Sequence, residues 1–491
     1  MGTKIGNPMA CGCRFDGWRA SIRLIGALLA AVLAVPSVVT AAPVRGKLVK
    51  PVQPDGTVID VLCWGDDYYV VAESVDGYTL VRDPQTGFIC YARLSEDGME
   101  LVSTGVAVGN GPPAGLVQHL RIRPESAAAR ARASRQAALA RGRAVVRPAS
   151  PAMLTLTTGN VQGICLLVDF SDDVATIPRT NVVNYCNQIG YTGYGNNGSI
   201  RDYYFDVSNG QLTFTHFVPT AYYRAQHAKS YYADPSVTWG DRGEELVKEA
   251  LDWLNNSGFD FSAYDADGNG EVDSVSCFYA GFCTNAWSEG LWPGNIHMDS
   301  DWDADGVSVT EFQMTDMGSS LAIETFCHEC GHLLLDWPDL YDYDDAPESS
   351  AGVGAFCIMC NGASATNPVE PCAYLKARAG WGSLVTLTAP QLMVTATAGS
   401  NVFYRVPHPT LPNEYYLIEN RQRTGRDANL PDDGLAIWHI DTNGSNSRQE
   451  MTPQSHYLVT LVQADGRWDF ENNRNWGDAT DLFAAPTYSA C

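Results

Sequence analysis

The segment FCHECGHLLLDWPDLYDYDD, from Phe326 to Asp345, is rich in residues that bind metals. Histidine and cysteine are both zinc ligands, so the segment is compatible with two different sites. On a helix with about 100° per residue, His328 and His332 lie about 40° apart on one face. Glu329 lies beside that face, where its carboxylate can reach a water on the metal. H-E-x-x-H on a helix is typical of a hydrolytic zinc site, with the glutamate as general base.

The cysteines of the same segment favour a competing interpretation. Cys327 and Cys330 share a face that points nearly away from the histidines, so one ion cannot take ligands from both sets. With Cys357 and Cys360 of the CIMC stretch they could form a structural zinc site. That site would leave the histidines unexplained. We therefore expect zinc at the histidines, and the cysteines on the core side of the helix.

The elements that must position these residues indicate an α+β fold. The stretch from Met317 to Asp339 predicts the metal-bearing helix, with Ser320 as its N-cap and Pro338 ending it. VQGICLLVDFSD predicts a buried strand, and GEELVKEALDWLNNSG predicts a second helix with a C-terminal Asn/Gly stop. We expect strands and turns to dominate after Ser383.

The N-terminus predicts export. Arg19 and Arg23 precede the apolar run from Leu24 to Val35, and an alanine-rich exit follows, so residues 1–42 are expected to be a secretory signal peptide. The run is shorter than the roughly 20 residues needed to span a bilayer. No later segment is long and apolar enough, so we expect a secreted protein without a membrane span after signal removal. The formal charge of −24 argues against nucleic acid as a partner.

The remainder of the chain predicts four regions. Residues 43–118 alternate apolar and polar positions between turn signals, which indicates a small β-rich unit. Residues 119–150 are rich in arginine and alanine, with little to bury; we expect a linker that proteases can cut, between a propeptide and an enzyme. Residues 151–383 should form the catalytic domain, and residues 384–491 a β-rich C-terminal region.

Cysteines and a second acidic segment suggest further sites. Of 14 cysteines, Cys11 and Cys13 leave with the signal; the others are disulfide candidates in an exported protein, and Cys63 with Cys90 is the simplest pairing. DADGNGEVD spaces oxygen ligands like the first part of a calcium loop, although Ser276 replaces the final glutamate. Its candidate ligands are Asp265, Asp267, Asn269 and Asp273. We expect structural calcium there, with an Asx-rich turn as the alternative; Asp478 and Asp481 could hold another cation.

Several blocks, in order, resemble the immune inhibitor A-type secreted metalloproteases, a zincin family. The resemblance covers most of the chain from Val52 onward. The blocks are QPDGTVIDV, DGYTLVRD, LLVDFSD, GSIRDYYFDVSNGQLTF, DADGNGEVDSV, FCHECGH, PDLYDY, GVGAFCIMCNG, YLKARAGWG, EYYLIENRQ, LPDDGLAIWHID and GDATDLF. Two departures occur: LLLDW is one residue longer than the family pattern and lacks its glycine, and the family domain usually extends past the last block. Because this chain stops at Cys491, we expect either that the last strands of the family domain are missing or that the sequence is truncated.

The resemblance implies roles for named residues. His328 and His332 would be zinc ligands and Glu329 the general base. An acidic third ligand should come from PDLYD: Asp339 first, with Asp342 and Asp336 as alternatives. Met359 would form an apolar floor under the metal.

The resemblance also implies an activity. We expect a zincin-type catalytic domain in a zinc-dependent endopeptidase, made as a latent precursor that is held by its own propeptide. The enzyme would be a monomer acting on protein or peptide substrates. The alternative is a non-catalytic binding or surface protein on a zincin scaffold. A pseudoenzyme should have lost a histidine or the glutamate, and all three are present.

Overall fold

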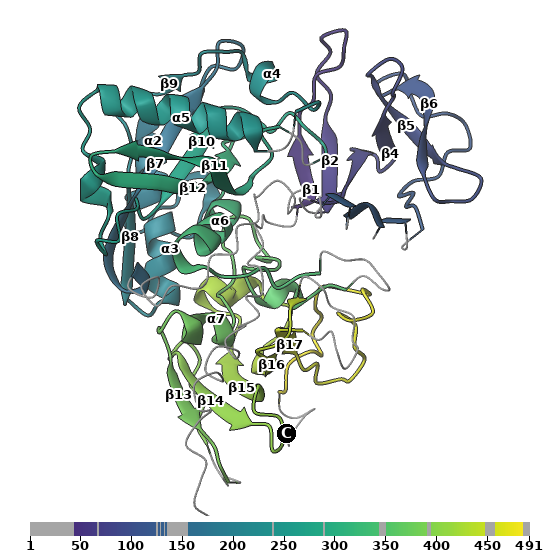
Figure 1. The fold of residues 1–491 in the computed structure, drawn as a ribbon. Coiled ribbons are helices and arrows are strands. Elements are labelled where there is room, and N and C mark those ends of the chain that lie inside the picture. The colour runs from purple at the N-terminus through teal and green to yellow at the C-terminus, as the bar shows by residue number, and fades with distance from the viewer. Residues whose placement is uncertain are drawn as a thin grey trace, which may run out of the picture.

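The computed structural model describes residues 44–65, 68–123, 126–127, 129–131, 133–134, 156–237, 240–287, 290–342, 350–389, 394–446 and 457–484. The predicted signal peptide and most of the predicted linker lie outside these residues. Three β-sheets and several helices make up the described chain, which confirms the α+β class (Figure 1). Among the described helices, none combines the length and the apolar character that a membrane crossing requires.

The first sheet is an antiparallel meander in chain order. Its strands are β1 (Val44–Val49), β2 (Val61–Gly65), β3 (Val70–Ser74), β4 (Thr79–Arg82), β5 (Ile89–Leu94) and β6 (Leu101–Ala107). Asp-Gly turns connect several of them, as the sequence predicts; Gly77, between β3 and β4, has a φ of 86°, which glycine adopts readily.

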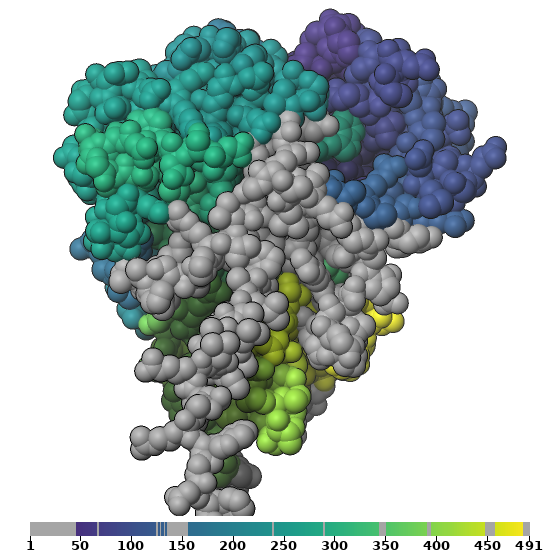
Figure 2. Space-filling view, in the orientation of Figure 1, coloured from purple at the N-terminus to yellow at the C-terminus, as the bar shows by residue number. Residues whose placement is uncertain are grey.

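The first sheet packs against the central part of the molecule. Lys47 forms an ion pair of 2.6 Å with Asp316, and the Lys50 amide donates to the Cys283 carbonyl over 3.1 Å. One buried cluster combines apolar residues of both parts: Val49, Val61, Cys63, Leu80, Cys283, Ala286 and Trp292 are among its members. Figure 2 shows the purple and blue atoms of this sheet against the teal atoms of the central part.

The central sheet has the order β11-β12-β10-β7-β8, with β9 beside β7. Its strands are β7 (Gly159–Asp169), β8 (Leu212–Phe217), β9 (Tyr223–Arg224), β10 (Val275–Tyr279), β11 (Gly294–Ala304) and β12 (Val307–Asp316). All pairings are parallel except that of β11 with β12. The predicted buried strand is β7, and its second half is buried throughout.

Helices cover both faces of the central sheet. On one face α5 (Asp241–Asn256), which the sequence predicts, packs on Ile164, Leu166 and Val168 of β7. The alternate residues Cys165 and Leu167 enter a second core, which holds helices from the other face. These are α2 (Arg179–Asn187), α3 (Ile200–Val207) and α6 (Ile323–Leu335); shorter helices are α4 (Lys229–Tyr232) and α7 (Ala373–Arg378).

The third sheet shares its core with α6. Its strands, in order, are β13 (Ser383–Thr386), β14 (Val402–Pro407), β15 (Glu414–Arg421), β16 (Gly434–Asp441) and β17 (Val459–Leu461). Buried side chains of this sheet, including Phe403, Leu417 and Trp438, belong to the cluster that contains Phe326 and Cys330 of α6. The division predicted near Ser383 therefore does not separate two cores.

The helix predicted to carry the metal ligands, α6, is shorter than predicted at both ends. It begins at Ile323, and the predicted cap, Ser320, lies outside it. The Asn196 side chain substitutes for a local cap: its Oδ1 accepts the Ile323 amide over 3.2 Å, and its Nδ2 donates to the Leu321 carbonyl over 2.7 Å. The helix ends at Leu335 because Asp336 adopts the left-handed conformation, two residues before Pro338.

The cysteines lie in the core but form no disulfide in the described residues. All eleven that the structure describes are buried, and none is joined to another in a disulfide. The expected pairing of Cys63 with Cys90 is not found: they lie on β2 and β5, with two strands between them, which places them roughly 14 Å apart and beyond the reach of a disulfide. Cys327 and Cys330 point into the core, as predicted from the helix geometry.

Candidate metal centre

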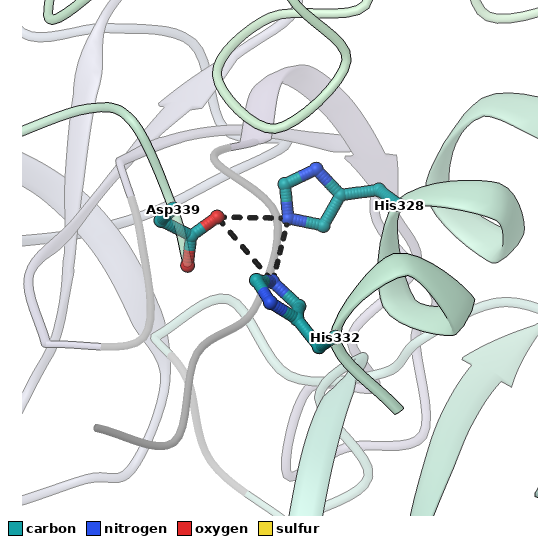
Figure 3. A group of neighbouring side chains, drawn as sticks. All are labelled: His328, His332 and Asp339. Carbon is teal, nitrogen blue, oxygen red and sulfur yellow. Dashed lines mark hydrogen bonds and ion pairs between the residues drawn. The ribbon is translucent and has the colours of Figure 1, made fainter. Parts of the chain in front are cut away.

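Three buried side chains converge on one point (Figure 3). The Nε2 atoms of His328 and His332 lie 3.0 Å apart, and Asp339 Oδ1 lies 2.9 Å from the first and 3.4 Å from the second. The two histidines come from successive turns of α6, and Asp339 comes from the loop that follows the helix. One ligand atom from each residue lies within 4.8 Å of the others, a spacing that a single metal ion can bridge.

Both imidazoles are held in the tautomer that a metal requires. His328 Nδ1 lies 2.8 Å from the Ile358 carbonyl, and His332 Nδ1 lies 2.6 Å from the Trp337 carbonyl. Carbonyl oxygens only accept hydrogen bonds, so each Nδ1 must carry a proton. The Nε2 atoms are therefore the ones left for a metal ion or a second proton, and they face each other and the Asp339 carboxylate. Backbone partners of this kind orient metal-binding histidines in many zinc proteins.

The electrostatics of the three groups favour a positive charge between them. Burial alone would lower the pKa of His328, but the hydrogen bond and charge of Asp339 outweigh it and raise the pKa to about 10. Burial would raise the pKa of Asp339, yet the two imidazoles hold it well below its usual range. Three lone pairs this close repel one another unless a proton or a metal ion lies between them. The donor set of two nitrogens and one oxygen fits zinc.

The loop after α6 selects Asp339 among the three acidic candidates. The left-handed turn at Asp336 reverses the chain, and the Trp337 amide bonds the Gly331 carbonyl over 3.2 Å. Asp336 itself is half-exposed and pairs with Arg378. Asp342 is buried but lies outside the group of converging ligand atoms. The structure thus brings Asp339, the first choice of the sequence analysis, to the two histidines. It brings neither Asp336 nor Asp342 into this group.

Glu329 is fully buried on α6, directly after the first histidine. Its carboxylate is close enough for its charge to act on His328. The structure therefore keeps a buried carboxylate within electrostatic range of His328.

Met359 packs under the helix at Gly331, the residue before His332, and is completely buried. The chain around Met359 also fixes the ligands: its carbonyl accepts the Leu340 amide over 2.7 Å, next to Asp339, and the preceding Ile358 carbonyl holds His328. The four cysteines of the competing zinc site do not form a ligand group: Cys360 donates to the Ala351 carbonyl, and Cys357 accepts the Cys372 amide.

The three candidate ligand side chains are almost fully buried. The side chains of His328 and Asp339 are 0% exposed and that of His332 is 6% exposed.

The predicted calcium loop precedes β10 and brings three carboxylates together. Ligand oxygens of Asp265, Asp267 and Asp273 lie within 4.8 Å of one another. Burial raises the pKa of Asp273 to about 7, and the charges of Asp267 and Asp265 act in the same direction. The Asn269 side-chain oxygen accepts a hydrogen bond from the Glu271 backbone amide over 2.7 Å. The backbone amide of Asn269 donates to the carboxylates of Asp265 and Asp267. These carboxylates fit a calcium ion, while the hydrogen bonds within the loop also fit the Asx-turn alternative.

Sequence reasoning missed the groups that orient the site. The Trp337 and Ile358 carbonyls carry no side-chain signature. Tyr204, whose hydroxyl donates to the Cys327 carbonyl over 2.6 Å, lies more than a hundred residues away in the sequence. Gly331 was the one available signal, since a glycine inside a helix indicates close packing.

Comparisons with known proteins add nothing to this geometry: no protein-family model matches the chain, and no curated protein matches it. Membership of the immune inhibitor A-type family therefore stays a prediction from the sequence blocks.

Proposed function

We propose that this protein is an exported zinc endopeptidase, made as a latent precursor, with a zincin-type site. The observation that carries the proposal is the convergence of His328 Nε2, His332 Nε2 and Asp339 Oδ1, with both Nδ1 atoms bonded to backbone carbonyls. Two imidazoles one helical turn apart, a carboxylate ligand and an adjacent glutamate are the set that H-E-x-x-H hydrolases use.

Each residue has a role in peptide hydrolysis. A bound zinc ion would supply Lewis acidity and lower the pKa of a coordinated water. The two histidines and Asp339 hold that ion in place through one ligand atom each. Glu329 accepts a proton from the attacking water and delivers it to the leaving amine. Met359 and Trp337 keep the helix side of the site apolar.

The buried site supports latency. A precursor must keep substrates from the metal, and His328 and Glu329 are completely buried in the full chain. The first sheet is packed against the central part through Lys47 and a shared apolar cluster. Cleavage in the predicted linker, residues 119–150, would leave this sheet held only by non-covalent contacts.

The test compares the purified exported chain before and after limited proteolysis in the linker. Metal content is measured by mass spectrometry and activity by casein hydrolysis. We expect one zinc per chain in both forms, and activity only after cleavage. Glu329→Gln should keep the zinc and lose activity by about 100-fold or more. Activity that survives Glu329→Gln would remove this residue from the mechanism.

The same experiment distinguishes the alternative of a non-catalytic binding protein. That protein would retain zinc but hydrolyse no peptide after linker cleavage. A cleaved chain that remains inactive, with zinc bound and the site open to a small chelator, would favour the alternative.

A further inference from the structure

A second group of carboxylates lies in the loop after β17. Ligand oxygens of Asp465, Asp469 and Asp478 are within 4.8 Å of one another. Calcium binds oxygen ligands at 2.3–2.6 Å, so two ligands on opposite sides of one ion are about 5 Å apart. The spacing therefore matches a single calcium ion, but acidic side chains alone do not make a site.

Asp481 supplies the independent observation. This residue is 0% exposed, and its Oδ2 accepts the Asp478 amide over 2.6 Å. Its Oδ1 is buried and accepts no hydrogen bond from the described residues. Its oxygens are not among those that lie within 4.8 Å of one another, but the hydrogen bond from the Asp478 amide places this carboxylate beside the group, and the charges of Asp478 and Asp465 act on it. An anionic oxygen that is buried among other anions is costly unless a proton or a cation compensates it.

The nearby arginines do not supply that cation. Arg467 lies 3.3 Å from Asp465 and 4.0 Å from Asp478, and Arg474 lies 3.3 Å from Asp469. Both arginine side chains are about 60% exposed, so they pair with the rim of the group. Exposed pairs of this kind contribute little, and neither arginine pairs with Asp481.

We propose that Asp465, Asp469 and Asp478, with the buried carboxylate of Asp481 beside them, bind a divalent cation of the calcium type, at a site distinct from the DADGNGEVD loop. An all-oxygen, carboxylate-rich set selects a hard cation over zinc.

The site is placed to support the floor of the metal centre. The Ala351 amide donates to the Phe470 carbonyl over 2.8 Å, and the Ala355 amide donates to the Trp476 carbonyl over 2.7 Å. Both carbonyls belong to the loop that carries the carboxylates. In the same segment, the Val353 amide donates to the carbonyl of Leu340 over 3.0 Å, and Leu340 directly follows Asp339. Calcium would therefore order the backbone under Asp339.

The experiment titrates calcium into the full, metal-depleted chain by calorimetry. The parent is Asp265→Asn/Asp267→Asn, which removes the other candidate site. We expect this parent to bind one calcium per chain, and Asp481→Asn in the parent to weaken binding at least about tenfold, because ligand charge sets calcium affinity. The amide oxygen introduced by this substitution would still accept the Asp478 amide, so the variant should fold. The control is Asp301→Asn in the same parent, at an exposed position on β11. It removes one negative charge as well, and it should bind calcium as tightly as the parent does.

Hydrogen exchange gives a second readout. In the parent, calcium should slow exchange of a peptide covering residues 350–360, and this slowing should vanish in the Asp481→Asn chain. Asp478→Asn serves as the replacement should Asp481→Asn fail to fold. A parent that binds no calcium up to millimolar concentration, or an Asp481→Asn chain with unchanged affinity, would overturn the site. Neither readout uses peptidase activity, so failure of the proposed function would leave both unaffected.

Discussion

The sulfur atom of Met359 lies directly against Gly331: a Cβ placed on Gly331 would stand 2.9 Å from this sulfur and 3.0 Å from the Trp337 ring. Glycine at this position lets the chain below approach the helix between its two histidines. The helix, the floor and the turn that leads to Asp339 are therefore one packed unit.

Gly331→Ala should disturb this unit. Alanine favours a helix by about 1 kcal/mol, but overpacking a buried contact costs about 1–3 kcal/mol. We expect a net loss of about 1 kcal/mol in the free energy of unfolding, measured in urea, and weaker zinc retention against a chelator. Shortening Met359 to valine in the same chain should restore part of the zinc retention. Unchanged stability and zinc retention in Gly331→Ala would contradict the close packing.

Asp339→Asn should weaken zinc binding, because it removes the one anionic ligand. We expect a loss of at least about 10-fold in affinity, measured by competition with a chromophoric chelator, because even an outer-shell partner of a metal ligand contributes that much. Asp336→Asn is the matched control, since Asp336 belongs to the same segment but pairs with Arg378. Equal effects of the two substitutions would show that Asp339 is not the ligand.

Zinc binding should strengthen as pH rises. Without metal, the pKa of His328 is raised to about 10, so this imidazole keeps a proton that zinc must displace. The apparent zinc affinity should therefore rise by about tenfold per pH unit between pH 7 and 9. The stabilisation that the proton gives the metal-free fold is complete below the ordinary histidine pKa and is lost as pH rises through about 10. A flat affinity profile would mean that no such proton is held.

Calcium removal should matter more at pH 8 than at pH 5. Burial raises the pKa of Asp273 to about 7, above its value in the unfolded chain. Without calcium, this group stabilises the fold fully below its unfolded pKa, and the contribution disappears as pH rises through about 7. At pH 8, calcium at about 100 times its Kd should add about 2.7 kcal/mol, seen as a higher Tm that EGTA reverses. The Asp265→Asn/Asp267→Asn chain should show a smaller shift.

Disulfides remain a prediction, because the structure describes eleven buried cysteines and no disulfide among them. Peptide mapping of the unreduced protein, alkylated in denaturant, checks this: a described cysteine that resists alkylation would contradict the structure. Linkage of Cys63 to Cys90 would require a different first sheet.

The sequence predicted the elements whose signal is local. The buried strand β7 and the helices α5 and α6 follow from runs and periodicities within a dozen residues or so. The ends of α6 were predicted wrongly, because Asn196 supplies its cap from a distant loop and Asp336 ends it by a left-handed turn.

Only part of the candidate site could be predicted, again because the sequence reveals local patterns and not contacts between distant segments. The spacing of His328 and His332 follows from one helix, whereas choosing Asp339 over Asp336 and Asp342 depends on how the chain turns after it. The carbonyls that fix both imidazoles come from Trp337 and Ile358, and nothing in a side-chain pattern marks a backbone oxygen. The shared core of α6 and the third sheet likewise depends on contacts between segments far apart in sequence.

Phe403, Leu417 and Trp438 complete the hydrophobic core beneath α6. The strands after Ser383 therefore help to hold α6 in place. A recombinant fragment that stops at this boundary would expose the apolar side of α6 to solvent and would be prone to aggregate. Anyone expressing a minimal version of this protein should keep those strands.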